Sequence, residues 1–337
     1  MAPGRCTIVG EHVDYAGGRV VAVAVDLTIR VAVRRSGDGR FSAHSNGRSV
    51  QRDSLDATPQ RDIGDRIFGA AAALRDAGIA VPPFETHVTT TLPEAVGLAS
   101  SAALICATMA ALLRLCGRTM SRSSLIAAAL HAERDLAGIP VGPLDPIVVV
   151  EAPPHGALLV DCAAQRATPL SWPWDDVVLC VCATGERHDV GGAGYRSRRK
   201  QVELDFARGD RSSPFARHVI EETARSDQAV VALRDDDATE LGRLMSQSHA
   251  SLRDLMEVST AALDAVVSAA AKVDGVFGAR LVGAGFGGSV VALCERRASE
   301  RCRTAMLEAA GPECLGAWEL NPAAGLAARE PDVVTDG

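Results

Sequence analysis

The sequence of 337 residues is poor in lysine, in aromatic residues and in long apolar runs. Lysine occurs only at positions 200 and 272, and phenylalanine, tryptophan and tyrosine together make up 4%. No apolar run approaches the ~18–20 residues that a membrane-spanning helix needs, and the N-terminus lacks a basic segment followed by an apolar one. We therefore expect no membrane contact, no signal peptide and a cytoplasmic protein.

Recognisable metal or disulfide motifs are also lacking. The nine cysteines form no CxxC pair, and Cys180 and Cys182 lie within an apolar run. Structural zinc sites usually take their ligands from closely spaced cysteine and histidine pairs, and small disulfide-bonded domains space their cysteines regularly. The pattern favours buried, reduced thiols that pack as small apolar residues.

The charge balance excludes two further classes of protein. The chain carries 42 acidic and 35 basic residues, a net charge of −7, and 47% hydrophobic residues. An acidic chain is not typical of general nucleic-acid binding, and this much apolar surface is not typical of intrinsic disorder. The length predicts one large or two ordinary domains, with a boundary near 163–174, where two prolines and two tryptophans occur.

Hydrophobic periodicity and turn residues predict a mixture of strands and helices. Strands are expected over 7–10, 84–92, 146–151, 157–161 and 177–183, with two strands or one long bent strand over 20–33 and a hairpin within 34–58. Helices are expected over 62–77, from 103 to 115, and over 121–137, 195–207, 214–233, 238–252 and 259–272. The segment 279–295 predicts a strand, a glycine-rich turn and then a strand or helix, and the tail 321–337 is expected to be partly disordered.

The segment PEAVGLASSA at 93–102 lies between a predicted strand and a predicted helix. At a helix start the unpaired backbone N–H groups and the helix dipole attract phosphate. Gly97 permits close approach of the backbone, and the hydroxyls of Ser100 and Ser101 can bind phosphate oxygens or Mg²⁺. Because no lysine is present, the GxxxxGK[ST] class of phosphate loop is excluded. The motif alone is also compatible with a helix that one serine merely caps.

Two further segments concentrate polar or small residues. GEHVDY at 10–15 follows a predicted strand, and the side chains of Glu11, His12 and Asp14 suit a ligand rich in hydroxyl groups. GAGFGGS at 283–289 follows an apolar segment, but the βαβ unit of a dinucleotide site does not follow it. A solvated polar turn and a tightly packed turn are the alternative explanations.

Two acids lie within HAERDLAGIPVGPLDP at 131–146. Glu133 falls on a predicted helix, and Asp145 falls in a loop that Pro143 and Pro146 stiffen, which would hold its carboxylate in place. Tyr195, one of only two tyrosines, precedes the basic run RSRRK at a predicted loop–helix boundary. The alternatives are an exposed turn acid and a solvated basic helix face.

Taken in order, these segments resemble the galactokinases of the GHMP small-molecule kinase superfamily. The resemblance rests on GRCTIVGEHVDYAGG, PEAVGLASSAAL, AERDLAGIPVGPLDP with GALLVDC, ERHDVGGAGYRSRRKQVE, MSQSHASLRDLMEVS and GARLVGAGFGGSVVAL. Each segment is modest evidence, but the ordered set spans nearly the whole chain and is specific. GEHxDY is characteristic of galactokinases and their closest relatives.

The resemblance implies a two-domain α+β fold, with a ribosomal protein S5 domain 2-like domain over 1–168 and a ferredoxin-like domain over 169–337. The active site would lie in the cleft between them. The implied reaction transfers the γ-phosphoryl group of ATP, with Mg²⁺ as cofactor, to the anomeric C1 hydroxyl of a monosaccharide, D-galactose. The expected partners are therefore a sugar and ATP, without nucleic acid or membrane, and the protein is expected to be a monomer or a homodimer.

By position, the resemblance also assigns roles to individual residues. Asp145 matches the general base, and Arg5 matches a cation that can keep it ionised and stabilise charge on the transferring group. Ser101 and Glu133 match the Mg²⁺ ligands. The sugar contacts match Glu11, His12, Asp14, Gly142 and Tyr195. The triphosphate loop matches Pro93, Gly97, Leu98, Ser100, Ser101 and Ala102, and a third family motif matches Gly283, Gly285, Phe286 and Gly287.

The chain departs from the family pattern at several points. Thr7 replaces an asparagine, GPLDP replaces GIMDQ around Asp145, and the aromatic residues that often enclose adenine are missing around 62–69. The alternatives are a kinase for another sugar at C1 (N-acetylgalactosamine, arabinose or a specialised-metabolism sugar) and a non-catalytic regulator that senses sugar and ATP. Retention of Asp145, Arg5, Ser101 and Glu133 favours catalysis.

Overall fold

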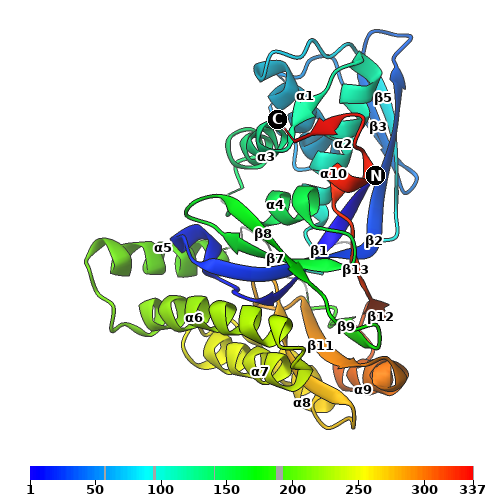
Figure 1. Cartoon of the computed structure of the whole chain (residues 1–337). Helices are drawn as coiled ribbons and strands as arrows, with labels where there is room; N and C mark the ends of the chain where they lie inside the picture. The colour runs from blue at the N-terminus through cyan, green and yellow to red at the C-terminus, as the bar shows by residue number, and fades with distance from the viewer. Residues whose placement is uncertain (57, 94–95, 140, 187–192, 337) are drawn as a thin grey trace.

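The computed structural model describes residues 1–56, 58–93, 96–139, 141–186 and 193–336. Parts of three predicted motifs, at 94–95, 140 and 187–192, therefore lie outside the described residues. Strands and helices are mixed along the described chain, and the two main sheets carry helices on their faces (Figure 1). This arrangement confirms the α+β prediction.

The first sheet is built on one long strand, β2 (Arg19–Arg35), which settles the choice between one strand and two. Its first half, rich in valine and alanine, is buried on successive residues, so both faces are covered there. From residue 30 to 34 exposed residues alternate with half-buried ones. The strand order is β4-β3-β5-β2-β7-β8, with β1 and β13 also paired to β2. The partner strands are β1 (Ala2–Val9), β3 (Phe41–Ser45), β4 (Arg48–Arg52), β5 (Phe84–Thr90), β7 (Gly156–Asp161), β8 (Arg166–Ser171) and β13 (Pro322–Ala323).

The hairpin predicted within 34–58 is confirmed as β3 and β4, joined by Asn46 and Gly47. Both turn residues have positive φ, the conformation that a two-residue hairpin turn requires. The three helices predicted for this half are also present, as α1 (Ile63–Asp76), α2 (Ser100–Cys116) and α3 (Arg122–His131), and α3 continues into a π-helical turn (Ala132–Leu136).

The strand predicted over 146–151 is wrong, because these residues form the helix α4 (Leu144–Glu151). The helix packs against α2, α3 and β1 and is buried around most of its circumference. A short apolar run of this kind gives no periodicity that separates a buried strand from a buried helix.

The second sheet is antiparallel, with the order β10-β11-β9-β12. Its strands are β9 (Val177–Ala183), β10 (Val276–Val282), β11 (Ser289–Glu295) and β12 (Gly316–Leu320). The second element of 279–295 is thus a strand. Helices cover the sheet, with α7 on β10 and α9 on β9. The helices of this half are α5 (Ala193–Ala207), α6 (Pro214–Arg234), α7 (Ala238–Asp254), α8 (Ala261–Ala270) and α9 (Ser299–Ala310).

The C-terminal tail is ordered up to residue 336, contrary to the prediction. It returns to the first sheet, where β13 pairs with β2, and continues as α10 (Leu326–Arg329) and β14 (Val334–Thr335), which pairs with β6 (Met120–Ser121). Leu326 and Val334 are buried, and Glu330 forms ion pairs with Arg114 and with the terminal amine of Met1. The predicted division after residue 168 falls within β8, and a two-domain division there stays a prediction.

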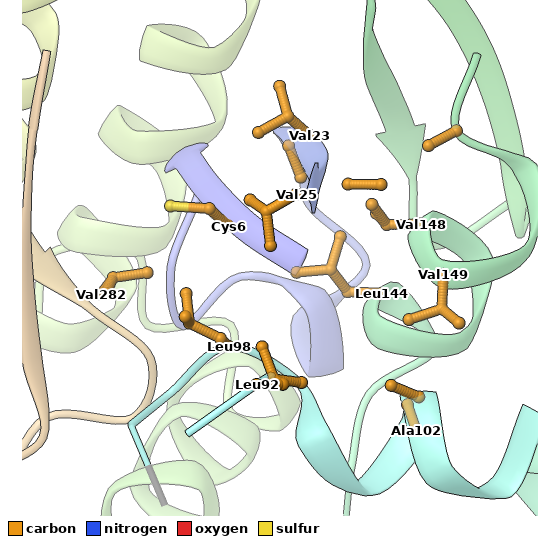
Figure 2. Packing of buried hydrophobic residues seen from close by; sticks show 14 of the residues in the cluster. Cys6, Val23, Val25, Leu92, Leu98, Ala102, Leu144, Val148, Val149 and Val282 are labelled. Atoms are coloured by element: carbon orange, nitrogen blue, oxygen red, sulfur yellow. The ribbon is translucent and has the colours of Figure 1, made fainter. Parts of the chain in front are cut away.

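The core below the predicted phosphate loop combines residues distant in sequence. Figure 2 shows Leu92 and Leu98 near Cys6 of β1 and Val25 of β2. All nine cysteines are free, and seven of them are buried. Among the described residues, no helix is long and apolar enough to cross a membrane.

Candidate active site

A cavity of about 1090 Å³ is lined by residues from both halves of the chain. The structure brings most of the predicted site residues to its wall: Arg5, Glu11, His12, Asp14, Pro93, Gly97, Ser100, Ser101, Glu133, Gly142, Asp145, Tyr195 and Gly283. Leu98 and Ala102 are different, because their side chains lie in the core (Figure 2). A contact from either residue to a ligand would have to come from its backbone.

Arg5 and Asp145 form an ion pair at the centre of the cavity. Arg5 lies on β1 and is buried, and its Nε donates to Oδ1 of Asp145 at 2.9 Å, with a second contact from the terminal nitrogen. The other terminal nitrogen donates to the carbonyl of Gly97 at 3.0 Å. Burial opposes the charge of Arg5, but Asp145 and Glu11 outweigh it, so the pKa of the guanidinium is raised. The Arg5 guanidinium therefore links Asp145, the predicted base, to Gly97 of the predicted phosphate loop.

The predicted phosphate loop leads into the uncapped start of α2. The N-cap is Ala99, at φ 58°, and among the described residues no side chain accepts from the first backbone N–H groups, so neither serine acts as the cap. Gly97 has φ 74°, and a Cβ there would lie 2.8 Å from the carbonyl oxygen of Val282. The loop thus needs glycine at this point, and it presents unpaired N–H groups to the cavity, the arrangement that binds an anion.

Ser101 and Glu133, the two predicted metal ligands, place oxygen atoms beside this helix start. Glu133 lies in the π-helical turn after α3 and is buried, and no described residue forms an ion pair with it. Burial raises the pKa of Glu133 to about 7, although the Ser101 hydroxyl works in the other direction. A buried carboxylate and a hydroxyl fit a hard divalent cation such as Mg²⁺, whose charge would offset the cost of burying the acid.

Arg66 was not predicted from the sequence, but it reaches the same point. Its Nε donates to Oγ of Ser101 at 2.8 Å, and it lines the cavity. The neighbouring lining residues Asp62 and Ile63 are not aromatic, in keeping with the missing adenine-enclosing residues. The sequence signal was only a basic residue near the start of a helix that also carries Asp65, Arg75 and Asp76.

Glu11 and His12 fasten the loop 10–15 to the glycine-rich turn after β10. Glu11 accepts from the backbone N–H of Gly283 at 2.7 Å. The His12 ring lies 2.9 Å from both the Tyr15 hydroxyl and the Ala284 carbonyl, so both ring nitrogens are occupied. Burial lowers the pKa of His12 to about 4, which leaves a neutral ring with one donor and one acceptor. These two residues position the loop, and a direct ligand contact by His12 would require one of its bonds to break.

Asp14 and Tyr195 are cavity residues of a different kind. Burial, and then the neighbouring Asp145 and Glu11, raise the pKa of Asp14 to about 6. Gly142 lies directly against this carboxylate, because a Cβ at Gly142 would overlap Oδ2 of Asp14. The ring of Tyr195 lies 5.8 Å from that of His12 and 6.1 Å from that of Tyr15. Asp14 and Tyr195 together form a polar part of the cavity wall next to Asp145, which we call the polar corner.

A buried network behind the loop was missed by sequence reasoning. Arg280 of β10 is fully buried and donates to the carbonyls of Thr7 and Ile8. The hydroxyl of Thr7 has no hydrogen-bond partner among the described residues, and Arg280 contacts β1 through the two backbone carbonyls. Glu222 of α6 accepts from the backbone N–H of Gly10 at 2.8 Å. Arg280 was a charge inside an apolar strand, whereas Glu222 lies among other charged residues of α6. Only the fold brings the two residues to the segment around β1.

Comparison with known proteins shows which protein family this chain resembles in sequence and fold. Residues 65–151 match the GHMP kinases N terminal domain, 229–313 match the GHMP kinases C terminal domain, and 1–35 match the galactokinase galactose-binding signature. The chain is 30% identical to a galactokinase of Thermotoga neapolitana over 319 residues, covering 90% of this chain and 91% of that one. The chain belongs to the galactokinase family of the GHMP kinases. It is therefore a sugar kinase, a phosphotransferase.

Further relatives agree with this placement in the galactokinase family. A Mycobacterium bovis galactokinase is 33% identical over 318 residues, covering 87% of each chain, and the Bos taurus galactokinase is 32% identical over 336 residues, covering 89% of this chain and 84% of that one. The fold resembles the crystal structure of Lactococcus lactis galactokinase complexed with galactose, with a TM-score of 0.88, 24% identity and coverage of 96% and 93%. A mevalonate kinase structure has a TM-score of 0.76 at 18% identity, covering 95% and 97%. The predicted GHMP kinase fold is confirmed.

Proposed function

We propose that this galactokinase-family protein transfers the γ-phosphoryl group of ATP to the C1 hydroxyl of D-galactose, with Mg²⁺. The observation that carries the proposal is the Arg5–Asp145 pair, which links a carboxylate beside the polar corner to the phosphate loop through the carbonyl of Gly97. The galactose-binding signature over residues 1–35 and the names of the relatives support galactose as the sugar. The C1 hydroxyl of the sugar and the γ-phosphate of ATP would meet beside this ion pair.

Asp145 is suited to accept the proton of the attacking hydroxyl. Its carboxylate is oriented by Arg5 from one side and lines the cavity on the other. As the hydroxyl oxygen bonds to the γ-phosphorus and the bond to the β-phosphate oxygen breaks, the proton passes to Asp145 and ADP leaves. Arg5 is close enough to the loop to offset negative charge on the transferring group.

The start of α2 is suited to hold the donor's phosphates. The unpaired N–H groups after Ala99 provide the anion site, and Arg66 adds a positive charge at Ser101. Ser101 and Glu133 would hold Mg²⁺, which when bound neutralises phosphate charge and orients the β- and γ-phosphates. Phosphoryl transfer depends mainly on such positioning and charge neutralisation.

A sugar panel tests the proposed function. ADP release would be measured by a coupled assay with Mg·ATP and galactose, N-acetylgalactosamine, arabinose, glucose or mannose. We expect the highest kcat/KM for galactose, and NMR of the product should place the phosphate on C1. Preference for another sugar would retain the kinase but overturn galactose. ATP and sugar binding without ADP release would instead support the regulator.

Sugar affinity should increase with pH as Asp14 loses its proton. With a pKa of about 6, Asp14 is largely protonated at pH 5 and largely a carboxylate at pH 7, and only the carboxylate accepts two sugar O–H bonds. Because this pKa is raised on folding, the contribution of Asp14 to the free energy of unfolding falls as pH rises from about 4 to about 6. Calorimetry with galactose between pH 5 and 8 should show tighter binding at high pH. Asp14→Asn should lose this dependence, and an unchanged profile in that variant would assign it to another group.

Glu133→Gln should raise the Mg²⁺ concentration needed for half-maximal activity on the order of tenfold or more. The substitution removes the charge that the cation would bind but retains the shape of the side chain. Glu151→Gln is a matched control, because Glu151 ends α4 and does not line the cavity. Activity titrated with MgCl₂ at fixed ATP gives the comparison. If both variants behave as the wild type, Glu133 is not a metal ligand.

A further inference from the structure

A cluster of two histidines and a glutamate lies on the first sheet, away from the cavity. His44 on β3 and His87 on β5 are register partners in the parallel β3–β5 pair, and Glu85 precedes His87 by two residues on the same face. The next residues along each strand, Ser45 and Val88, line the cavity. Because side chains alternate along a strand, the cluster occupies the opposite face of the same strands.

The distances within the cluster match those between ligands of one small cation. Nε2 of His44 and Nε2 of His87 each lie 3.3 Å from Oε1 of Glu85, and the ligand atoms all lie within 4.8 Å of one another. Two ligands at tetrahedral positions around Zn²⁺, each bonded at about 2.0–2.2 Å, are separated by about 3.3–3.6 Å. The two rings are stacked, with centroids 4.6 Å apart and an interplanar angle of 16°, so a rotation of the exposed His87 ring would be needed to bring both Nε2 lone pairs to one cation.

Neighbouring groups prepare the three ligands. Nδ1 of His44 lies 2.7 Å from the hydroxyl of Ser49 on β4, and a proton donated there leaves Nε2 with a lone pair facing Glu85. Nε of Arg34 donates to the other carboxylate oxygen, Oε2, at 2.8 Å. Oε1 is left to face the Nε2 atoms of the two imidazoles. With neutral rings of this tautomer, two ring lone pairs and a carboxylate oxygen lie within 4.8 Å of one another, and a bound cation would relieve their mutual repulsion.

We propose that His44, Glu85 and His87 form a binding site for a divalent transition-metal cation such as Zn²⁺. Two imidazoles and one carboxylate suit Zn²⁺, Ni²⁺ or Cu²⁺, whereas Mg²⁺ prefers oxygen ligands only. The site is thus chemically distinct from Ser101 and Glu133, and it does not depend on the proposed function. Solvent would complete the coordination, because His87 is exposed and the other two ligands are half-buried.

A bound cation would cross-link β3 to β5 on the reverse side of the cavity wall. The parallel β3–β5 pair spans only four register pairs, and β3 connects to the rest of the sheet through β5. Binding to the folded protein stabilises it by mass action. The midpoint of thermal unfolding should therefore rise with Zn²⁺ concentration.

The test is calorimetric titration of the metal-stripped protein with ZnCl₂, in excess MgCl₂ so that the cavity carboxylates are occupied. We expect one Zn²⁺ per chain and a rise in the unfolding midpoint, both lost in the double variant His44→Ala/His87→Ala. These side chains are not buried, so the variant should fold, which circular dichroism can verify. Ser49→Ala should bind Zn²⁺ about 10–100-fold more weakly, since it removes only the partner of Nδ1.

His155→Asn is the matched control, because His155 is an exposed histidine elsewhere, in a turn at φ 51°, which asparagine tolerates. It should bind Zn²⁺ like the wild type. The proposal is overturned if the wild type does not bind Zn²⁺, or if the double variant binds it unchanged, which would place the cation at another site.

Discussion

Asp145→Asn is expected to lower kcat by about 100-fold or more while the KM for the sugar changes little. Asparagine has nearly the same shape as aspartate but cannot take the proton of the attacking hydroxyl. The ion pair with Arg5 also disappears, which leaves a buried guanidinium without its main partner. Steady-state kinetics with varied galactose at saturating Mg·ATP gives the split between kcat and KM.

The control for this variant is Asp227→Asn, the same chemical change in another arginine–aspartate pair. Asp227 on α6 pairs with Arg19 at the surface, and neither residue lines the cavity. Thermal unfolding should be measured for both variants, because the unpaired Arg5 is expected to destabilise the first one. A raised KM with an unchanged kcat would show that Asp145 binds the sugar rather than accepting its proton.

Gly142→Ala is expected to raise the galactose KM by about tenfold or more, because the pocket has no room for the added methyl group. A Cβ at this position overlaps Oδ2 of Asp14, so the carboxylate must move away from its place in the polar corner. The Kd for Mg·ATP should stay near that of the wild type, since neither residue belongs to the phosphate loop. Calorimetry with each ligand separately, together with the kinetics, distinguishes the two effects.

Gly37→Ala provides the comparison for the added methyl group. A Cβ at Gly37 meets nothing within 4 Å, and this glycine does not have a positive φ. Wild-type kinetics are expected for Gly37→Ala. If Gly142→Ala retains the wild-type galactose KM, Asp14 does not contact the sugar from its position in this structure.

The strand and the helix on either side of the predicted phosphate loop were predictable from sequence because their structure is local. A strand, small residues and a helix start follow one another within 84–116, and each responds to backbone rules that act over a few residues. The apolar segment 146–151 was not predictable in the same way, because nothing within it separates a buried strand from a helix. Its helical form depends on contacts with α2 and β1.

The tail shows a second limit of sequence reasoning. Its proline, alanine and aspartate content is typical of a flexible end, yet β13 pairs with β2, almost 300 residues away in the chain. Such pairing depends on which strand edge is free in the folded molecule, and the composition of the tail does not contain that information. Leu326, Val333 and Val334 are among the residues that the tail buries against the rest of the molecule.

The sequence by itself determined the candidate residues and their chemistry, since the ordered motifs name Arg5, Ser101, Glu133 and Asp145. The tertiary structure decided which of them meet. It placed Arg5 on Asp145 across 140 residues of chain, assigned Glu11 and His12 to holding the loop, and brought Arg280 and Arg66 to the site. Motif chemistry follows from local residue types, whereas charge pairing and burial depend on packing between distant segments.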